Sequence, residues 1–311
     1  MPVPEPRRVT DPTDPGVAVF SQLRDRHVRD RDGRFIAEST AVLKRLLRLW
    51  PQHVDRILID ERRWDGLAPD IAAHLERASR RGAPIECMVA SSEIIESIAG
   101  FDVHRGILAA GRRPSKEEQH RRLCDLRSLT DDSTVPRTLI ALDGVADVTN
   151  IGTIVRLAAG FRCDGLLLSA TCGDPLYRKA IRVSMGQVFS LPWVHLPVPD
   201  AVHLVDALHP DHRTATTPAA STGDARYRMI AIETTERARP CWDIHFPSHV
   251  CLVFGHEDQG VSPGVLSRCD DVISIPMPAH VTSVNVATSA AIVLYERQRQ
   301  LMMGAGQGHH A

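Results

Sequence analysis

The stretch VFGHEDQGVS, residues 253–262, leaves an apolar run through two glycines and several acidic or amide side chains. The run before it, CLVF at 251–254, is typical of a buried strand. A chain that leaves a hydrophobic core through Gly255, Glu257 and Gly260 either makes a plain strand-to-helix turn or closes around a ligand. Two other polar stretches in the second half of the chain bear on this choice.

Length and composition place the chain among globular proteins with room for two domains. It has 311 residues, of which 43% are apolar and 24% charged, and its formal net charge is −1. A net charge near zero means that any nucleic-acid surface must come from local basic patches. No run approaches about 18 apolar residues and the N-terminus has no apolar signal core, so we expect a cytoplasmic or nuclear protein that is not membrane-bound, with the cytoplasm favoured. The seven cysteines include no Cys-x-x-Cys pair, which favours reduced thiols.

The first third of the chain predicts a flexible tail and a small α/β domain. Residues 1–32 are rich in Pro, Asp and Thr and then in alternating charges, and we expect them to be flexible. The charged run 24–34 fits either a solvated helix end or a surface that faces RNA. Residues 33–113 alternate helical and strand-like patterns, as α/β domains do. We expect helices at 39–50, 68–82 and 91–100 and strands at 54–60, 85–90 and 105–111.

A polar segment, residues 114–135, predicts a linker, partly helical, between this domain and a second α/β domain. The second domain spans 136–303, and a loose tail at 304–311 follows it. We expect its strands at 137–145, 165–170, 226–234 and 249–255 and its helices at 151–161 and 284–300, with a basic segment at 174–189.

Three stretches of the second domain are more polar or more constrained than their surroundings. Asn150 precedes a helix that contains Arg156, which taken alone is a helix cap followed by a surface arginine. The second stretch is the loop 255–260. In the third, a proline ends a strand and a loop leads to Ser283 and Asn285, which alone is a proline-stopped strand and a serine-capped helix. A dinucleotide fold is a weaker alternative because no Gly-x-Gly-x-x-Gly is present.

In this order and at these separations, the three stretches resemble the motifs of the SpoU/TrmH family of RNA 2′-O-ribose methyltransferases. The resemblance covers about residues 136–300 and includes the basic segment between the first two motifs. Residues 33–113 are similar to the ribosomal-protein-like RNA-binding domain that many members carry. The matching positions are Asn150-x-Gly152-x-x-x-Arg156, Gly255-x-Glu257-x-x-Gly260, and Ile275-Pro276-Met277 through Ser283-x-Asn285-Val286.

Four positions depart from the family pattern, each by a small change that conserves shape. None of them removes a charged or amide group, so they affect fine affinity more than activity. They are Thr149 in place of the usual proline, Ala279 in place of glycine, Val284 in place of leucine and Ala287 in place of serine.

The resemblance implies an α/β trefoil-knot fold whose second and third motif loops cradle S-adenosylmethionine, chiefly with backbone groups. Backbone approaches a ligand closely only where no Cβ intervenes, which accounts for the glycines of the opening stretch. By motif position, the residues around the cofactor are Gly255, Ile275, Met277 and Val284.

The same resemblance assigns the catalytic work first to Arg156 and Asn150. A guanidinium stays protonated at neutral pH, so we expect Arg156 to clamp the phosphate beside the reacting ribose and to stabilise the developing alkoxide. Asn150 and Glu257 would hold Arg156 and the loops in place. Ser283 and Asn285 would order the third motif.

Local basic residues are the expected RNA contacts. Arg178, Lys179 and Arg182 lie beside one aromatic residue in the segment LYRKAIR, although a solvated helix face has the same pattern. The segment KRLLR in the first domain is a weaker candidate. We expect no metal site, because the two histidine pairs lack further ligands at metal spacing and are interpreted as surface residues. These pairs are His209 with His212 and His245 with His249.

These features predict an S-adenosylmethionine-dependent 2′-O-methyltransferase of structured RNA, with ribosomal RNA favoured over transfer RNA. The alternative is a non-catalytic RNA-binding or ribosome-assembly protein that kept the fold. We also expect a homodimer formed by the second domain, because the helix at 284–300 is apolar or small on nearly every face. The competing explanation is that the first domain of the same chain covers that helix.

Overall fold

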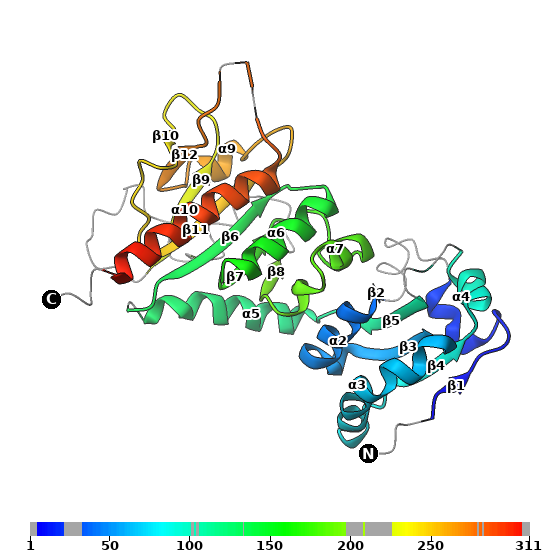
Figure 1. Cartoon of the computed structure of the whole chain (residues 1–311). Coiled ribbons are helices and arrows are strands. Elements are labelled where there is room, and N and C mark those ends of the chain that lie inside the picture. Colours follow the sequence, from blue (N-terminus) through cyan, green and yellow to red (C-terminus); the bar gives the residue numbers. More distant parts are fainter. Residues whose placement is uncertain are drawn as a thin grey trace. The chain divides into compact units, whose positions relative to one another are not determined.

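The chain folds as two compact units, each built around its own β-sheet (Figure 1). Residues 1–115 together with 174–190 form the first unit, and residues 116–173 together with 191–311 form the second. No helix in the described part of the chain is long and apolar enough to cross a membrane. The computed structural model describes residues 5–21, 33–100, 103, 106–132, 134–196, 208, 226–278, 280–281 and 283–306.

The sheet of the first unit is mixed, with the strand order β1-β4-β3-β5-β2. β1, β4 and β3 are parallel, whereas β5 pairs antiparallel with both β3 and β2. The strands are β1 (Arg7–Arg8), β2 (Arg34–Glu38), β3 (Val54–Asp60), β4 (Glu86–Ala90) and β5 (Ile107–Arg112). The helices are η1 (Pro15–Phe20), α2 (Thr40–Leu49), η2 (Pro51–His53), α3 (Glu61–Arg80) and α4 (Ser92–Ala99).

Side-chain alternation along these strands explains why the sheet is covered on both faces. Ile36, Leu58 and Met88 are buried in one cluster with residues of η1 and α4. The alternate residues Phe35 and Ile57 are also buried, and the two-residue period of a strand points them to the other face, where α2 and α3 pack. Burial on both faces lets this small sheet build a core of its own.

The helix α3 begins earlier than its sequence pattern predicts. It starts at Glu61 and not at 68, because the Asp60 carboxylate caps it by accepting a hydrogen bond from the Arg62 N–H at 2.9 Å. The first turns contain a glycine and Pro69, which usually break helices. Burial of Leu67 and its neighbours against the sheet outweighs that preference. The other predicted helices and strands of this unit are present, and β1 and β2 were not predicted.

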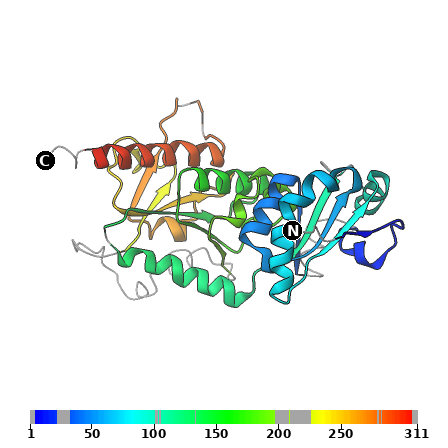
Figure 2. The same ribbon diagram turned by 60° about the horizontal axis from the view of Figure 1, so that its bottom comes forward.

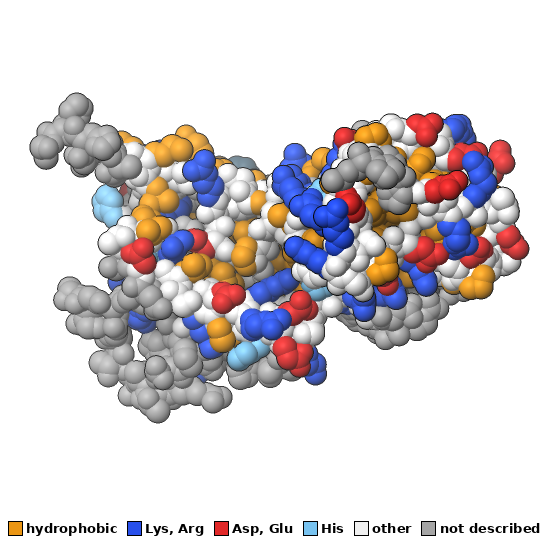
Figure 3. Space-filling model, turned by 90° about the horizontal axis from the view of Figure 1, so that it is seen from below, with side chains coloured by type: hydrophobic (Ala, Val, Ile, Leu, Met, Phe, Trp, Pro, Cys, Tyr) orange, Lys and Arg blue, Asp and Glu red, His pale blue; other side chains and the backbone are white. Residues whose placement is uncertain are grey.

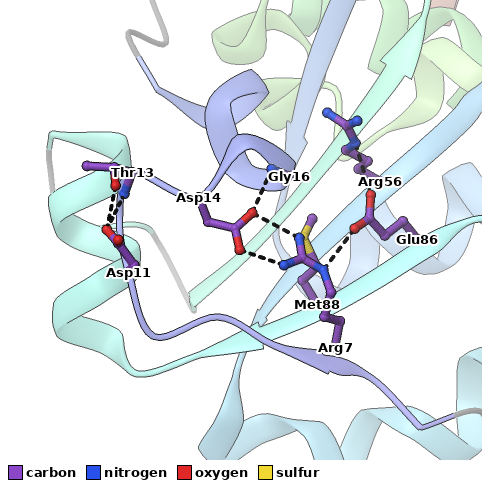
Figure 4. A network of polar contacts seen from close by, with 8 residues as sticks. All are labelled: Arg7, Asp11, Thr13, Asp14, Gly16, Arg56, Glu86 and Met88. Atoms are coloured by element: carbon purple, nitrogen blue, oxygen red, sulfur yellow. Dashed lines mark hydrogen bonds and ion pairs between the residues drawn. The ribbon is translucent and has the colours of Figure 1, made fainter.

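The predicted flexible tail is wrong for residues 5–21, which pack into the first unit. Phe20 of η1 is fully buried. The Arg7 guanidinium donates hydrogen bonds to Asp14 at 2.6 Å and to Glu86 at 3.0 Å, which fastens the segment to the sheet (Figure 4). The low average hydrophobicity of this segment led to the wrong prediction, because a few apolar residues of η1 bury enough surface to order the segment. Residues 1–4 and 22–32, with most of the charged run 24–34, lie outside the described residues.

The sheet of the second unit is parallel at every pair of neighbouring strands, in the order β10-β12-β9-β11-β6-β7-β8. β11 is buried at all 7 positions, as expected of a strand covered on both faces. α6 and α10 lie side by side on one face and α5 lies on the other (Figure 2). The strands are β6 (Arg137–Asp143), β7 (Gly165–Leu168), β8 (Trp193–His195), β9 (Arg228–Ile232), β10 (Arg239–Pro240), β11 (His249–Gly255) and β12 (Asp271–Ser274). The helices are α5 (Lys116–Ser128), η4 (Leu129–Asp131), α6 (Val148–Gly160), α9 (Pro263–Leu266) and α10 (Val286–Gly306).

Both ends of the second unit differ from the predicted domain boundaries. The segment 114–135, predicted as a linker, contains α5, which packs against β8 and buries Leu126 in the core of this unit. The Leu126 carbonyl also accepts a hydrogen bond from the Tyr227 hydroxyl at 3.3 Å. At the other end, α10 continues to Gly306, inside the predicted tail 304–311.

Residues 174–190 were predicted within the second domain, yet they belong to the first unit. The segment carries α7 (Arg178–Val183) and η5 (Gln187–Phe189). The buried Asp174 carboxylate accepts a hydrogen bond from Arg113 at 2.6 Å. Arg182 donates to the buried Glu38 carboxylate at 3.0 Å. Because buried carboxylates need such partners, these ion pairs hold the segment on the first unit.

The burial of thiol and imidazole groups agrees with one sequence expectation and corrects another. All seven cysteines are free thiols, and burial raises the pKa of Cys251 well above its ordinary range. His249 is buried, so the prediction of a surface histidine is wrong at this position. As the first residue of the central strand it lies beside Arg137 and Arg297, and burial together with these charges lowers its pKa. His209 and His212 lie outside the described residues.

Candidate active site

A cavity of about 890 Å³ lies at the carboxyl ends of β9, β11 and β12 and beside the start of α10. Parallel α/β sheets bind ligands at this edge, because the loops that leave neighbouring strands diverge there. The volume is in the range of small-molecule sites. Its lining consists of residues 232–234, 254–260, 274–278, 281, 283–286 and 289.

A continuous chain of side-chain hydrogen bonds joins the three polar stretches beside this cavity. The Asn285 amide donates to the Asn150 side-chain oxygen at 2.9 Å. The Asn150 amide in turn donates to Glu257 at 2.8 Å. Asn150 is 7% exposed and lies in the first turn of α6, where Asp147 and not Asn150 caps the helix. Asn150 is therefore a bridge between loops, and the simple cap reading of this residue is wrong.

The Glu257 carboxylate is the centre of this chain. It accepts hydrogen bonds from the backbone N–H groups of Ala146 and Asp147, both at 3.1 Å, besides the one from Asn150. Burial acts to raise the pKa of Glu257, but these donors outweigh it and the net pKa is lowered. Glu257 therefore stays ionised and ties the loop after β11 to the start of α6.

Asn285 orders the third stretch at the start of α10. Its side-chain oxygen accepts hydrogen bonds from the N–H groups of Ala287 at 2.9 Å and Thr288 at 3.3 Å, so Asn285 caps the helix. Ser283 lines the cavity and is exposed. The simple reading of a serine-capped helix is therefore wrong, because the capping side chain is that of Asn285.

Glycine is required in the opening stretch because the loop after β11 closes tightly on itself. The His256 N–H donates to the Gly260 carbonyl at 3.0 Å, and the Gly260 N–H donates to the His256 carbonyl at 2.9 Å. A Cβ on Gly255 would lie 2.0 Å from the Gly260 carbonyl carbon. Gly260 has a φ of 69°, a left-handed conformation that favours glycine. The stretch is a compact ligand-side loop and not a plain turn into a helix.

Two further carboxylates fix this loop, and sequence reasoning missed both. Glu233 follows β9 and accepts a hydrogen bond from the Val261 N–H at 2.8 Å. Asp143 ends β6, is buried, and accepts one from the Ser262 N–H at 2.8 Å. The sequence offered one signal for these two residues, an acidic side chain at the end of an apolar strand. Only the folded structure shows that both carboxylates bind the loop that contains Glu257.

The residues predicted to surround the cofactor lie in one place. Gly255, Ile275, Met277 and Val284 all line the cavity. The walls around them combine apolar side chains with exposed loop backbone, which suits a ligand with a nucleoside and a charged tail. Ala279, one of the departures from the family pattern, lies outside the described residues.

Arg156 does not join this group within one chain. It lies on α6, is exposed and is not among the residues that line the cavity. It lies six positions after Asn150, and at 3.6 residues per turn this spacing puts the two side chains on different faces of the helix. No hydrogen bond or ion pair of Arg156 is found among the described residues.

The predicted RNA-binding residues differ in whether they pair with a carboxylate of the same chain. Arg178 and Arg182 both pair with the buried Glu38, at 3.7 and 3.0 Å. Lys179 between them is exposed. Within the described residues there is no group of three or more His, Cys, Asp or Glu side chains placed to hold a metal ion. The molecular face in Figure 3 carries acidic and basic side chains together, in keeping with the net charge of −1.

The geometry defines an α/β protein with a ligand pocket where three polar loops of a parallel sheet meet. Residues 137–295 match the model of the SpoU rRNA Methylase family. A protein named an uncharacterized tRNA/rRNA methyltransferase, from Mycobacterium bovis, is 31% identical over 97% of this chain and 92% of its own. The chain therefore belongs to the SpoU rRNA methylase family and is an RNA methyltransferase.

A further relative and a solved structure extend the comparison beyond the matched residues 137–295. The 23S rRNA (guanosine-2′-O-)-methyltransferase RlmB of Acinetobacter baylyi is 28% identical over 70% of this chain and 79% of its own. The AdoMet-bound rRNA methyltransferase from Sinorhizobium meliloti superposes with a TM-score of 0.70 at 22% identity, covering 95% of this chain and 98% of that one. The second likeness shows a shared fold across both units.

Proposed function

We propose that the protein transfers a methyl group from S-adenosylmethionine to a ribose 2′-hydroxyl of structured RNA, with ribosomal RNA as the favoured substrate. The observation that carries this proposal is the hydrogen-bonded chain from Asn285 through Asn150 to Glu257 beside the cavity. It joins all three motifs of a family whose relative RlmB is named for 2′-O-methylation of 23S rRNA. The ribosomal preference is an inference from that name.

The residues that would hold the cofactor are those of the cavity wall. Gly255, Ile275, Met277 and Val284 would pack against it, and the turn closed by Gly260 would present backbone groups. When bound, S-adenosylmethionine supplies an electrophilic methyl group: a carbon–oxygen bond forms to the ribose, the carbon–sulfur bond breaks, and the hydroxyl proton leaves to a phosphate oxygen or water. The cavity of about 890 Å³ has room for such a ligand, and the missing side chain at Gly255 lets the loop that forms its wall close on Gly260.

Arg156 would act on the RNA side of the reaction. Its planar guanidinium suits bidentate contact with the phosphate beside the target ribose and stabilises negative charge on the attacking oxygen. Asn150, Glu257, Ser283 and Asn285 would keep the loops in place for alignment of the two reactants. Their part in catalysis is positioning, whereas Arg156 touches the substrate.

A homodimer through the second unit would complete the site. Arg156 is exposed and away from the cavity of its own chain, so a second copy is one source of the arginine that faces the cofactor. α10 also keeps an apolar outer face, since Tyr295 is 63% exposed and Met302 67% exposed. We expect an interface above about 2,000 Å². Light scattering at twice the chain mass of 34.3 kDa tests the dimer.

RNA would be held by basic side chains that the fold leaves free. Lys179 on α7 and Arg48 on α2 are exposed, and Arg45 beside Arg48 has its pKa lowered by burial and by that neighbouring charge. Unneutralised charge of this kind favours phosphate. We further propose that the protein works in the cytoplasm and needs no metal ion.

Transfer of a labelled methyl group tests the proposed function directly. Purified protein is incubated with labelled S-adenosylmethionine and either ribosomal RNA or transfer RNA, and the RNA is digested to nucleosides. We expect label in 2′-O-methyl nucleosides from ribosomal RNA. Label on a base, or no label together with no cofactor binding by calorimetry, would contradict the proposal.

A further inference from the structure

The wall of the cavity carries negative charge. Its described lining includes three carboxylates, Glu233, Glu257 and Asp258, and no lysine or arginine. One imidazole, that of His256, lies among them. A site of this composition favours a cationic ligand over a neutral ligand of the same shape, because charges a few ångströms apart in a protein cleft are screened less than in bulk water.

The three carboxylates differ in how much of their charge remains available. Glu257 accepts three hydrogen bonds from Ala146, Asp147 and Asn150. Asp258 is exposed, so water and salt screen it. Glu233 is half-buried, and among the described residues its two oxygens accept hydrogen bonds from backbone N–H groups only.

Glu233 is held firmly in this position. One carboxylate oxygen accepts from the Thr234 N–H at 2.9 Å and the other from the Val261 N–H at 2.8 Å. A Cβ on Gly260 would come within 2.1 Å of the same carboxylate, so the loop after β11 passes directly over it. Each carboxylate oxygen has a second acceptor site and both donors are neutral, so no ion pair within the described part of the chain cancels the negative charge.

We propose that Glu233 is a specificity-determining residue that makes the pocket prefer the sulfonium form of the cofactor over its demethylated product. The proposal rests on the proposed function and goes beyond it. The two ligands differ by one methyl group and one positive charge on sulfur. A fixed carboxylate in the wall attracts the charged sulfonium and not the neutral thioether of the product. Preference for the cation speeds exchange of product for fresh cofactor. It also stabilises the ground state before the charge disappears in transfer, which limits the rate of the chemical step.

Calorimetry on full-length protein measures the effect without catalysis. S-adenosylmethionine, S-adenosylhomocysteine and a cofactor analogue with an amine in place of the sulfonium are titrated into wild type and Glu233→Gln. We expect the variant to bind both cations about tenfold more weakly and the neutral product less than about threefold more weakly. Glu236→Gln is the matched control, because it makes the same change at an exposed carboxylate outside the cavity lining, and its ligand preference should stay within about twofold of wild type.

Two measurements separate charge from loop positioning. Glu233→Asp keeps the charge but shortens the reach to Val261, and we expect it to retain the preference for cations even if all affinities fall. In wild type, raising the salt from about 0.05 to about 0.5 M should weaken cation binding more than product binding. Equal losses for all ligands in Glu233→Gln, or a salt-independent preference, would overturn the inference. A wild type that binds neither the cofactor nor the product would overturn the proposed function itself.

Discussion

The helices α6 and α7 both carry arginines for which the sequence predicts a role toward RNA, yet these arginines differ in their contacts within the fold. On α7, Arg178 and Arg182 are engaged by the buried Glu38, and they fasten the segment 174–190 to the first unit. On α6, Arg156 is exposed and has no hydrogen bond or ion pair among the described residues. An arginine that pairs with a buried carboxylate stabilises the fold. An arginine without such a partner keeps its guanidinium available for phosphate.

The largest expected effect is on chemistry at α6. Arg156→Ala should lower methyl transfer by about 100- to 1,000-fold, since it removes the group that we propose contacts the reacting RNA, while cofactor affinity stays within about twofold. Single-turnover transfer and calorimetry measure the two quantities. Arg182→Ala on α7 is the matched control and should retain most of the transfer rate.

Arg156→Lys sharpens the same comparison. Lysine keeps the positive charge but loses the bidentate fork, so we expect it to restore little activity. Near wild-type turnover of Arg156→Ala on its RNA would show that the assigned role is wrong.

The next largest effect concerns the loop that receives the cofactor. Gly255→Val should weaken cofactor binding by at least about 100-fold, because even its Cβ would lie 2.0 Å from the Gly260 backbone. Gly160→Ala is a suitable control, since a Cβ at Gly160 meets nothing within 4 Å. Calorimetry with the cofactor checks both variants. Retained affinity in Gly255→Val would place the ligand elsewhere.

A smaller effect is expected where the arginines are structural. Glu38→Gln should lower the free energy of local opening of the segment 174–190 by about 2 kcal/mol, because it leaves partly buried arginines without their carboxylate. Hydrogen exchange followed by mass spectrometry on peptides of that segment measures the opening. The exposed Glu93→Gln in α4 should leave it unchanged. If Glu38→Gln changed cofactor affinity more than it changed hydrogen exchange of this segment, Glu38 would serve the active site and not hold the segment on the first unit.

The smallest effect is a pH dependence of the second unit. The folded pKa of Glu257 is lowered from an ordinary value of 4.5, so its contribution to stability is present above that value and is lost as pH falls through the folded pKa. The melting temperature of wild type should therefore exceed that of Glu257→Gln at neutral pH, and the gap should narrow below about pH 4.5. A gap that stays constant down to pH 3 would exclude this contribution.

Much of the second unit could be predicted from the sequence, because its strands are apolar runs and its helices follow a 3.6-residue period. The pattern predicted β6, β7, β9 and β11 and the helices α6 and α10. Elements with weaker patterns were missed, among them the three-residue strand β8 and the two-residue strand β10. Such short strands are defined by their neighbours in the sheet and not by their own composition. The trefoil knot implied by the resemblance stays a prediction.

Motif spacing in the sequence determined the family, the three polar stretches and the residues of the cavity wall. Tertiary structure decided how those residues are used. In the folded chain Asn150 bridges two loops, where the sequence allowed a helix cap. Glu38 pairs with the arginines of α7. The fold also brought Glu233 and Asp143 to the loop after β11 from strands far away in sequence.

The physical reason is that a motif records chemical type and separation along the chain, whereas charge and hydrogen bonding depend on what lies within a few ångströms. A glycine that allows close approach can be recognised in sequence because its constraint is local to the backbone. The partner of an arginine or a carboxylate is contributed by another strand or helix. Only the folded chain therefore distinguishes Arg178 and Arg182, which pair with a buried carboxylate, from Arg156, which has no such partner among the described residues.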